Sequence, residues 1–533
     1  MGIEDVVREA IRSSFGIDYK EAIPLSRPKK PEFGDMSTSV AFQLAKRLGS
    51  SPNVISEKIA KELASTSELF ERVTTQGGYI NFHFGKTFFS KLIGDIISGK
   101  LASLVRRLSD GEFVQIEYVS ANPTGPLNVV SARAAAVGSS LVNILRRVGY
   151  DVKGEYYLND AGNQVRLLTE SLRARIKQLK GERADIPDEG YHGEYLLDYA
   201  RDAIEENVPD DRLSDWILSR ITDDIKETLK RFGVCFDSWV SERELRSSGR
   251  VEKLISELDK KHLVYEKDGA IWFAATSLDP ESEQDYVLVK SDGEYSYFAV
   301  DIAYHLDKFQ RGFSHVWDIW GPDHHGHIKR MQLALRSLGY DRAFSAILLQ
   351  QVNIVEEGKR RKMSKRRGEL VTLNELLGEI DTDVARFFFL DRRVGAHLDF
   401  DLELARKESE ENPVYYVKYA HARIRSIERL AGLRGITPGS IENLLGIPEF
   451  LHLARRVAEY PDVIVRTARE LETHILTDYL LALSRDFHHF YHIHRVITGD
   501  RERSSGMLSL VLAVAEVIKD GLALLGIEAP ERM

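Results

Sequence analysis

One short stretch in the first third of the chain constrains the fold more than any other. Residues 112–120 read EFVQIEYVS, which is typical of a strand, and a loop rich in proline and glycine follows. Residues 132–148 have the composition of a helix, and a second apolar strand ends near Tyr157. Strand, loop, helix and strand within about fifty residues form a βαβ unit, whose two strands are parallel. We therefore predict an α/β fold built on a doubly wound, Rossmann-type parallel sheet.

The length of the chain indicates further domains around this sheet. At 533 residues it exceeds what one hydrophobic core usually serves, so we expect about three domains. Residues 1–108 have the pattern of a small α+β domain with a linker, residues 109–400 carry the sheet, and residues 401–533 are almost wholly helical. Residues 165–230 are charged and helical, as an insertion would be. Further strands are predicted at residues 270–274, 286–290, 295–300, 315–319 and 346–350.

Charge and hydropathy argue against two classes of protein. A formal net charge of -9 disfavours indiscriminate nucleic-acid binding, so any RNA site must be a local basic patch. The most apolar stretch, residues 507–525, is interrupted by Glu516, Lys519 and Asp520. We interpret it as a buried helix rather than a membrane span.

The cysteine and histidine residues do not have the spacing of a complete metal site. Cys235 is the only cysteine, which excludes an intramolecular disulfide and a CxxC motif and suits a reducing, cytoplasmic location. A catalytic thiol and an inert core thiol are both compatible with it, and we favour the inert one. His488 and His492 have the spacing of a zinc pair, but no third ligand presents itself, so core or RNA-facing histidines are favoured. We predict no permanently bound metal.

Two segments have the composition of a nucleotide site. Residues 358–367, GKRRKMSKRR, are a solvated basic loop, a localisation patch, or a loop that brings lysines to the β- and γ-phosphates of ATP. The chain has no Walker A sequence. Instead, residues 120–133, SANPTGPLNVVSAR, leave a strand and enter a helix, whose first N–H groups form an anion site. An ordinary strand-to-helix turn remains the alternative.

Together these segments resemble the arginyl-tRNA synthetases, a family of class I aminoacyl-tRNA synthetases. Lys362-Met363-Ser364-Lys365 resembles the KMSKS loop of class I enzymes, and residues 117–127, EYVSANPTGPL, resemble the ATP-loop region of the arginyl enzymes. Similar segments are YYLNDAGNQ at 156–164, YFAVDIAYH at 297–305, GPDHHGHIKRM at 321–331, NPVYYVKYAHARI at 412–424 and ALLGIEAPERM at 523–533.

The resemblance implies a reaction and its partners. It implies activation of arginine by ATP with Mg²⁺, transfer to the 3′-terminal adenosine of tRNA(Arg), and activation that requires bound tRNA. We expect a cytoplasmic monomer. The first domain would bind the tRNA elbow and the last the anticodon.

It also implies site residues. The arginine pocket falls on Glu117, Ser120, Asn122, Glu242, Tyr297 and Asp301. The ATP site falls on Asn128, Ser131, Gly321, Asp323, His324, Lys362 and Lys365, with Lys362, Ser364 and Lys365 catalytic. The tRNA contacts fall on Tyr79, Asn81, Tyr416, Tyr419, His421 and Arg423. An acidic pocket suits arginine, because paired carboxylates hold the planar fork of donors of a guanidinium.

One departure from the family stands out. Where the family commonly has His-x-Gly-His, this chain has Asn128-Val129-Val130-Ser131. We expect phosphate anchoring to be shared by Asn128, the N–H groups of the helix start, Lys362 and Lys365. A catalytically silent relative that binds tRNA as a regulatory module is the main alternative. A synthetase for another amino acid is disfavoured by the acidic pocket.

Overall fold

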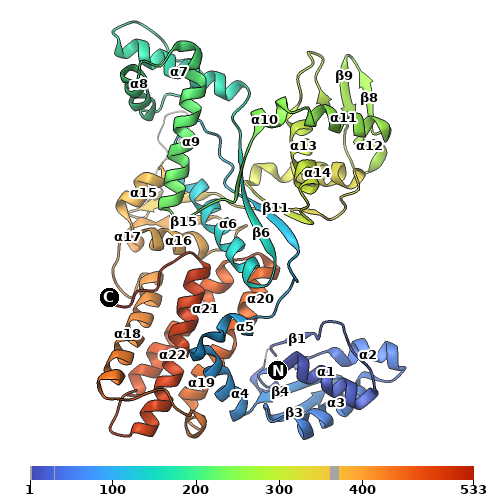
Figure 1. Ribbon diagram of the computed structural model, residues 1–533, viewed down its shortest axis with the longest axis vertical. Helices are drawn as coiled ribbons and strands as arrows, with labels where there is room; N and C mark the ends of the chain where they lie inside the picture. The colour runs from blue at the N-terminus through green and yellow to red at the C-terminus, as the bar shows by residue number, and fades with distance from the viewer. Residues whose placement is uncertain (1–2, 29, 361–370) are drawn as a thin grey trace.

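The computed structural model describes residues 3–28, 30–360 and 371–533 (Figure 1). A parallel sheet lies in the middle of an elongated molecule, with two lobes on one side and two further units on the other. The predicted catalytic residues Lys362, Ser364 and Lys365 lie outside the described residues.

The N-terminal unit is the predicted α+β domain. Its antiparallel sheet has the order β1-β2-β4-β3 and consists of β1 (Leu25–Ser26), β2 (Met36–Thr38), β3 (Phe70–Gln76) and β4 (Tyr79–Phe84). Three helices pack with it: α1 (Ile3–Phe15), α2 (Val40–Leu48) and α3 (Pro52–Thr66). The helices α2 and α3 are separate because Gly49 takes a left-handed conformation and Ser51 caps α3 by accepting a hydrogen bond from the Val54 N–H.

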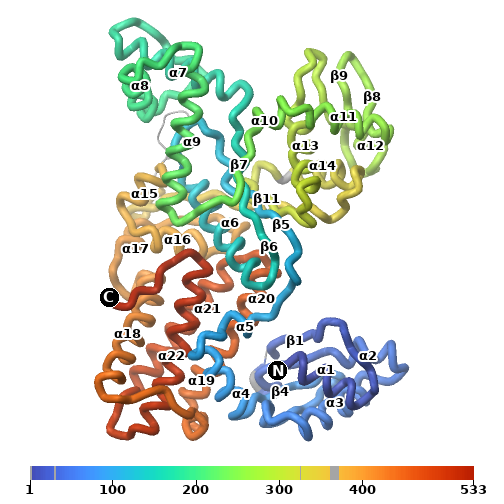
Figure 2. Tube along the Cα trace, viewed as in Figure 1, coloured from blue at the N-terminus to red at the C-terminus, as the bar shows by residue number. Residues whose placement is uncertain are grey.

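A short helical connector leads to the central sheet. It comprises α4 (Lys86–Asp95), a π-helical turn at Ile96–Lys100 and α5 (Leu101–Leu104). Figure 2 shows this connector running beside α22 (Arg501–Leu524), the last helix of the chain. The connector therefore ties the N-terminal unit to the C-terminal bundle.

The central sheet has five parallel strands in the order β12-β11-β5-β6-β7. They are β5 (Phe113–Glu117), β6 (Asp151–Leu158), β7 (Ser238–Ser241), β11 (His315–Trp320) and β12 (Phe344–Leu348). The predicted βαβ unit is confirmed as β5, α6 (Val129–Arg147) and β6. The order of the strands reverses between β5 and β11. Ligands of doubly wound folds bind at the carboxyl ends of the strands at such a switch point.

The two faces of the sheet are covered by different helices. Val114 and Ile116 on β5 share a core with α6 on one face. Phe113 and Glu117, which flank these two residues, lie on the other face of the sheet, toward α13 (Tyr297–Gln310). This alternation is the two-residue period of a strand. It turns Glu117 toward α13.

Two lobes rise from the sheet (Figure 1). One holds the predicted helical insertion and comprises α7 (Asn163–Leu179), α8 (Tyr195–Glu205) and α9 (Leu213–Arg231). The other contains α13, α14 (His325–Ser337), α10 (Glu242–Ser247), α11 (Arg250–Lys260), α12 (Ala275–Leu278) and an antiparallel sheet of β8 (Val264–Lys267), β9 (Ala270–Phe273) and β10 (Tyr286–Val289).

The strand predicted at residues 295–300 is wrong, because this segment begins α13. Ser296 caps the helix by accepting a hydrogen bond from the Ala299 N–H. Phe298 and Val300 are buried in the core of this lobe. Aromatic and β-branched residues favour strands locally, but burial on a helix face outweighs that preference.

A small three-stranded sheet follows, with β13 (Val352–Glu356), β14 (Lys359–Arg360) and β15 (Leu398–Asp401) in the order β14-β13-β15. The helices α15 (Leu373–Glu379), α16 (Thr382–Leu390) and α17 (Leu402–Ala405) accompany it. The rest of the chain is the predicted helical unit: α18 (Pro413–Leu433), α19 (Pro448–Ala458), α20 (Tyr460–Glu470), α21 (His474–Ile493) and α22.

The apolar segment of residues 507–525 lies mostly within α22, most of whose residues are buried. No helix in the described part of the chain combines the length and the apolar run that a membrane crossing needs. Arg386 of α16 anchors the end of this segment, since its buried guanidinium donates to the carbonyls of Leu525 and Phe232. The helical unit is thereby joined to the sheet domain.

Candidate functional site

The predicted arginine-pocket residues gather at the carboxyl edge of the central sheet. Glu117 ends β5, and Ser120 and Asn122 follow it in the loop before α6. Glu242 begins α10 directly after β7, while Tyr297 and Asp301 lie in the first turns of α13. Segments far apart in the sequence thus meet at the switch point, where the fold places a ligand.

Tyr157, at the end of β6, shows that the pocket carboxylates converge. Burial raises the pKa of its phenol, and three nearby carboxylates raise it further, those of Glu242, Asp301 and Glu117. The Tyr297 side chain is 68% exposed, and its hydroxyl lies beside Gly162. The arrangement is a cluster of carboxylates around Tyr157, with Tyr297 exposed to solvent at the start of the same helix as Asp301.

Each of the three carboxylates already has a basic partner within the protein. Lys308 Nζ lies 2.6 Å from Glu117 Oε2, and Arg246 Nη2 lies 2.6 Å from Glu242 Oε1. Asp301 contacts two imidazoles, those of His305, with Nδ1 3.2 Å from Oδ1, and His327. A ligand therefore meets carboxylates whose charge is partly compensated.

The three carboxylates differ in the exposed fraction of the side chain. It is 28% for Asp301 but only 8% for Glu117 and 3% for Glu242. The alternation along β5 turns Glu117 toward buried Lys308, and its contact with the substrate stays a prediction. Its second oxygen accepts from Ser120 Oγ at 2.8 Å. Glu117 is thus placed to hold Ser120 and the loop after β5.

Behind the pocket lies a buried network of charges that sequence reasoning missed. Lys308 Nζ is 3.0 Å from Asp318 Oδ1, and His305 Nε2 is 2.8 Å from Asp318 Oδ2. Burial and Lys308 lower the pKa of His305, but Asp318 and Asp301 outweigh them and raise it to about 10. An ion pair so buried is costly to break, by about 3 to 5 kcal/mol when one partner is removed. The one signal in the sequence was polar residues at core-facing positions of a helix and a strand.

A second buried group anchors β6 to the same helix. Arg311 holds Glu155 with two bonds of 2.6 and 2.9 Å, and the Tyr304 hydroxyl donates to the same carboxylate at 2.7 Å. Burial alone would raise the pKa of Glu155, but Arg311 and Lys308 hold it at about 2. The helix that carries Asp301 is therefore locked onto three strands.

The expected nucleotide loop is a capped helix start. Asn128 Oδ1 accepts from the N–H groups of Val130 at 2.9 Å and Ser131 at 3.0 Å. These two N–H groups are engaged, so the expectation that they serve a phosphate is corrected. The cap uses only the oxygen of the Asn128 amide, and its nitrogen can still donate.

The chain on the far side of the basic run returns to the same helix start. Thr372 forms a β-bridge with Asn128, and the Leu373 N–H donates to the Leu127 carbonyl at 2.7 Å. Gly321, Asp323 and His324 follow β11, the strand next to β5, and Asp323 and His324 are exposed. The described parts of the predicted nucleotide segments therefore share one edge of the sheet with the acidic residues.

Three family models match the chain. They are the arginyl tRNA synthetase N terminal domain at residues 1–84, the catalytic domain of class I (R) tRNA synthetases at residues 95–387, and the DALR anticodon binding domain at residues 417–533. The chain belongs to the arginyl-tRNA synthetase family.

Relatives and solved structures agree with this placement. The arginine--tRNA ligase of Carboxydothermus hydrogenoformans is 42% identical over 549 residues, which is 99% of this chain and 97% of that protein. That of Thermotoga maritima is 40% identical over 548 residues, or 100% and 99%. An arginyl-tRNA synthetase structure from Campylobacter jejuni is 33% identical with a TM-score of 0.76, covering 84% of this chain and 100% of its own. The Thermus thermophilus enzyme, at 22% identity and a TM-score of 0.74, covers 100% and 99% and supports the fold.

In this arginyl-tRNA synthetase fold, the N-terminal residues predicted to meet tRNA differ in exposure. Tyr79 is 47% exposed and packs edge-on against Phe42, with ring centroids 5.2 Å apart. Asn81 is only 5% exposed, because β4 is a central strand paired with β2 and β3. Both residues stay predictions as base contacts, and Tyr79 presents the larger exposed surface.

The C-terminal residues predicted to contact tRNA also differ in exposure. Arg423 lies between two rings, 5.2 Å from the centroid of Tyr419 and 4.5 Å from that of Tyr491. His421 is corrected: it is fully buried, and its Nδ1 lies 2.8 Å from the Pro530 carbonyl. At about 100° per residue, position 421 falls on the opposite face of α18 from 419 and 423.

A cavity of about 490 Å³ adjoins these aromatic residues. It is lined by Tyr419, Arg423, Tyr491 and the last two residues, Arg532 and Met533. Sequence reasoning missed Tyr491, Arg532 and Met533, which reach the site only through tertiary packing. Tyr416 lies nearby against His488, with ring centroids 4.6 Å apart.

Cys235 and the possible metal ligands were also considered in the predictions from the sequence. Cys235 is exposed and free, so its interpretation as a core thiol was wrong; it follows Val234 in the turn after α9, where the chain returns to the surface. Within residues 3–28, 30–360 and 371–533, no three His, Cys, Asp or Glu side chains are arranged to hold a metal ion.

Asn128→Ala should weaken adenylate formation by about 1 to 3 kcal/mol, the range for losing one transition-state donor. Because alanine also removes the helix cap, worth about 1 kcal/mol of stability, Asn128→Ser is the matched control that keeps a capping oxygen. Loss in both variants, measured by single-turnover adenylate formation, indicates that the amide donates to ATP. Full activity of Asn128→Ser would mean that Asn128 acts only as a helix cap. Full activity of both Asn128→Ala and Ser131→Ala would mean the same. Since asparagine does not titrate, the loop should add no pH step near 6.5.

Proposed function

We propose that this member of the arginyl-tRNA synthetase family ligates arginine to tRNA(Arg) in two steps. In the first, a carboxylate oxygen of arginine attacks the α-phosphorus of ATP and displaces pyrophosphate, which gives arginyl-adenylate. In the second, the ribose 2′-hydroxyl of the terminal adenosine attacks the arginyl carbonyl carbon, and AMP leaves. ATP enters as its Mg²⁺ complex and is a substrate of the reaction.

The observation that carries the proposal is the acidic site at the switch point. Asp301 is its most accessible pocket carboxylate, and Tyr297 forms its open wall. A guanidinium presents a planar fork of donors that a carboxylate accepts in a bidentate manner, whereas a lysine ammonium matches it less well. Asn122 and Ser120, on the loop after β5, are the proposed partners of the α-amino and α-carboxylate groups of arginine. Glu242 is proposed as a buried acidic side of the site.

The nucleotide is proposed to bind at the same edge. Asn128, Ser131, Gly321, Asp323 and His324 would bind ATP, and Lys362, Ser364 and Lys365 would meet the departing pyrophosphate. The support is topological: the chain beyond the basic run returns to Asn128 through Thr372. In-line attack needs the arginine carboxylate and the α-phosphate to adjoin, and one sheet edge supplies both sites.

The tRNA is proposed to contact both ends of the molecule. Residues 1–108, with exposed Tyr79, would meet the elbow, residues 109–400 the acceptor end, and residues 401–533 the anticodon. Tyr416, Tyr419 and Arg423 offer rings and a cation on which unpaired bases can stack. A cytoplasmic location and a monomeric state stay predictions.

Exchange of labelled pyrophosphate into ATP tests the proposal. We expect exchange only when arginine and tRNA(Arg) are both present, because the family resemblance implies activation coupled to tRNA. Lysine in place of arginine is the matched control and should give none. Rapid exchange without tRNA would contradict the coupling. No exchange under any condition would favour the silent, tRNA-binding relative that the Asn128-Val129-Val130-Ser131 sequence keeps open.

A further inference from the structure

His327 lies between the segment proposed for ATP and the residues proposed for arginine. It is on the first turns of α14, directly after the segment proposed for ATP, yet its Nε2 bonds to Asp301 Oδ2 of the arginine pocket. Its ring also packs against Trp320, with centroids 5.2 Å apart, and against Phe298, 6.0 Å apart. The imidazole is therefore held in one orientation toward Asp301.

Arg330 determines where the proton of this imidazole resides. The Arg330 Nε–H donates to His327 Nδ1. A ring nitrogen that accepts a hydrogen bond carries no proton, so the ring proton is on Nε2. The Nε2–H consequently donates to Asp301, and a chain of three groups runs from Arg330 through His327 to the carboxylate.

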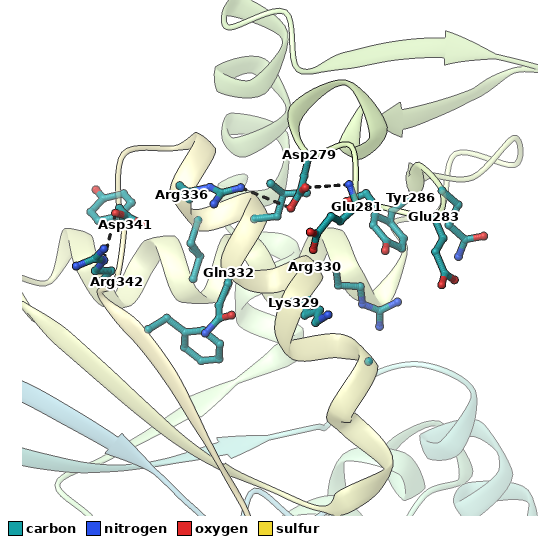
Figure 3. A pocket seen from close by; sticks show the side chains of 17 residues that line it. Asp279, Glu281, Glu283, Tyr286, Lys329, Arg330, Gln332, Arg336, Asp341 and Arg342 are labelled. Atoms are coloured by element: carbon teal, nitrogen blue, oxygen red, sulfur yellow. Dashed lines mark hydrogen bonds and ion pairs between the residues drawn. The ribbon is translucent and has the colours of Figure 1, made fainter. Parts of the chain in front are cut away.

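The Arg330 guanidinium is itself fixed by aromatic rings. It lies 5.3 Å from the centroid of Phe298 and 5.6 Å from that of Tyr286. It borders a cavity of about 580 Å³ between α14 and the segment of Asp279–Tyr286 (Figure 3). Figure 3 shows Lys329 and Arg330 of α14 on one side of this cavity and Asp279 and Glu281 on the other. The cation therefore stands at the rim of a solvent space, with its Nε turned inward to His327.

We propose that His327 is a positioning residue, which orients Asp301 for the substrate guanidinium and takes its own orientation from Arg330. This rests on the proposed function, in which Asp301 binds arginine. His305 Nδ1 contacts Oδ1 of Asp301 and His327 contacts Oδ2, so each oxygen keeps one further acceptor direction. One remaining acceptor site on each oxygen can take the two donors that a guanidinium presents in a bidentate pair.

The proposal predicts a selective kinetic effect. Without the His327 bond, the carboxylate can rotate away from the orientation that accepts both guanidinium donors. Losing a hydrogen bond to a charged group corresponds to about 10- to 100-fold. His327→Phe, which keeps an aromatic ring against Trp320 and Phe298, should therefore raise the arginine KM by about that factor. The ATP KM should change by less than about threefold, because His327 acts through Asp301.

Rescue separates this role from packing. In His327→Gln, the amide oxygen can accept from Arg330 and the amide nitrogen can donate to Asp301. We expect His327→Gln to recover the arginine KM to within about fivefold of the native protein, where His327→Phe does not. Should His327→Phe fail to fold, His327→Asn, whose shorter amide cannot bridge the two partners, takes its place.

A double-variant cycle tests the contribution of Arg330. Arg330→Met keeps an apolar stem over Tyr286 and Phe298 while removing the donor to His327. If Arg330 acts only through His327, the variant with both changes should be no worse than His327→Phe alone. Fully additive losses would overturn the part of the proposal that concerns Arg330.

The outcome that overturns the proposal is distinct from failure of the proposed function. An unchanged arginine KM in His327→Phe, alongside a clear loss in Asp301→Asn, would contradict the positioning role. An increase in the ATP KM alone would assign His327 to the nucleotide instead. If Asp301→Asn itself leaves arginine kinetics unchanged, the assignment of the arginine pocket fails first.

Discussion

Asp301→Asn should lower kcat/KM for arginine by a factor that corresponds to about 2 to 5 kcal/mol of lost transition-state stabilisation, the range for unpairing a buried, charge-assisted contact. Asp301 is the pocket carboxylate with the largest exposed side-chain fraction, 28%; it bonds to His327 and lies 3.2 Å from Nδ1 of His305. An asparagine in its place offers one acceptor oxygen instead of two, and it leaves the His305 imidazolium facing a neutral amide. Both changes weaken bidentate capture of the guanidinium.

The measurement is steady-state aminoacylation with arginine varied and ATP and tRNA saturating. Asp307→Asn is a matched control, because Asp307 lies on the same helix and pairs with Arg250 and Arg311, each at 3.0 Å, away from the pocket. It should affect stability and leave the arginine KM within about twofold. Unchanged arginine KM and kcat in Asp301→Asn would remove this residue from the pocket.

Lys362→Ala and Lys365→Ala should each lower kcat by about 10²- to 10³-fold and change the ATP KM much less. Negative charge builds up on pyrophosphate as the bond to the α-phosphorus breaks, and a cation that meets it stabilises the transition state more than bound ATP. Both lysines lie outside the described residues. Their assignment follows from the KMSKS-like sequence and from the Thr372 bridge to Asn128 that follows it.

Arg360→Ala is the control for the lysines. Arg360 lies in the same basic run, just before the two lysines, but its guanidinium pairs with Asp399 at 3.2 Å on β15 of the same small sheet. Its loss should change kcat by less than about threefold, as for an exposed ion pair. A rise in the ATP KM with kcat preserved in the lysine variants would mean that they steer phosphate electrostatically and do not act in the transition state.

Local patterns in the sequence were sufficient for the architecture. The βαβ unit at residues 112–158, the helical insertion and the helical C-terminal unit follow from periodicities of two and 3.6 residues, which a chain expresses whatever its partners are. Short motifs were likewise enough to place the chain in its family, since their residues are contiguous. The strand predicted at residues 295–300 failed where local preference and burial disagree, and burial decided.

The partners of the polar side chains were decided only by the tertiary structure. Glu117 meets Lys308, 191 residues away, and Asp301 meets His327, 26 residues away, because β5, α13 and α14 pack together. Asn128 caps its helix while Thr372 lies beside it, and His421 is buried while Tyr419 and Arg423 share an open face. A periodic pattern specifies which face of an element is apolar, but the charge and exposure of a side chain depend on what another segment brings to it. The sequence by itself therefore determined the family and most of the elements, and packing determined which acidic side chain stays accessible.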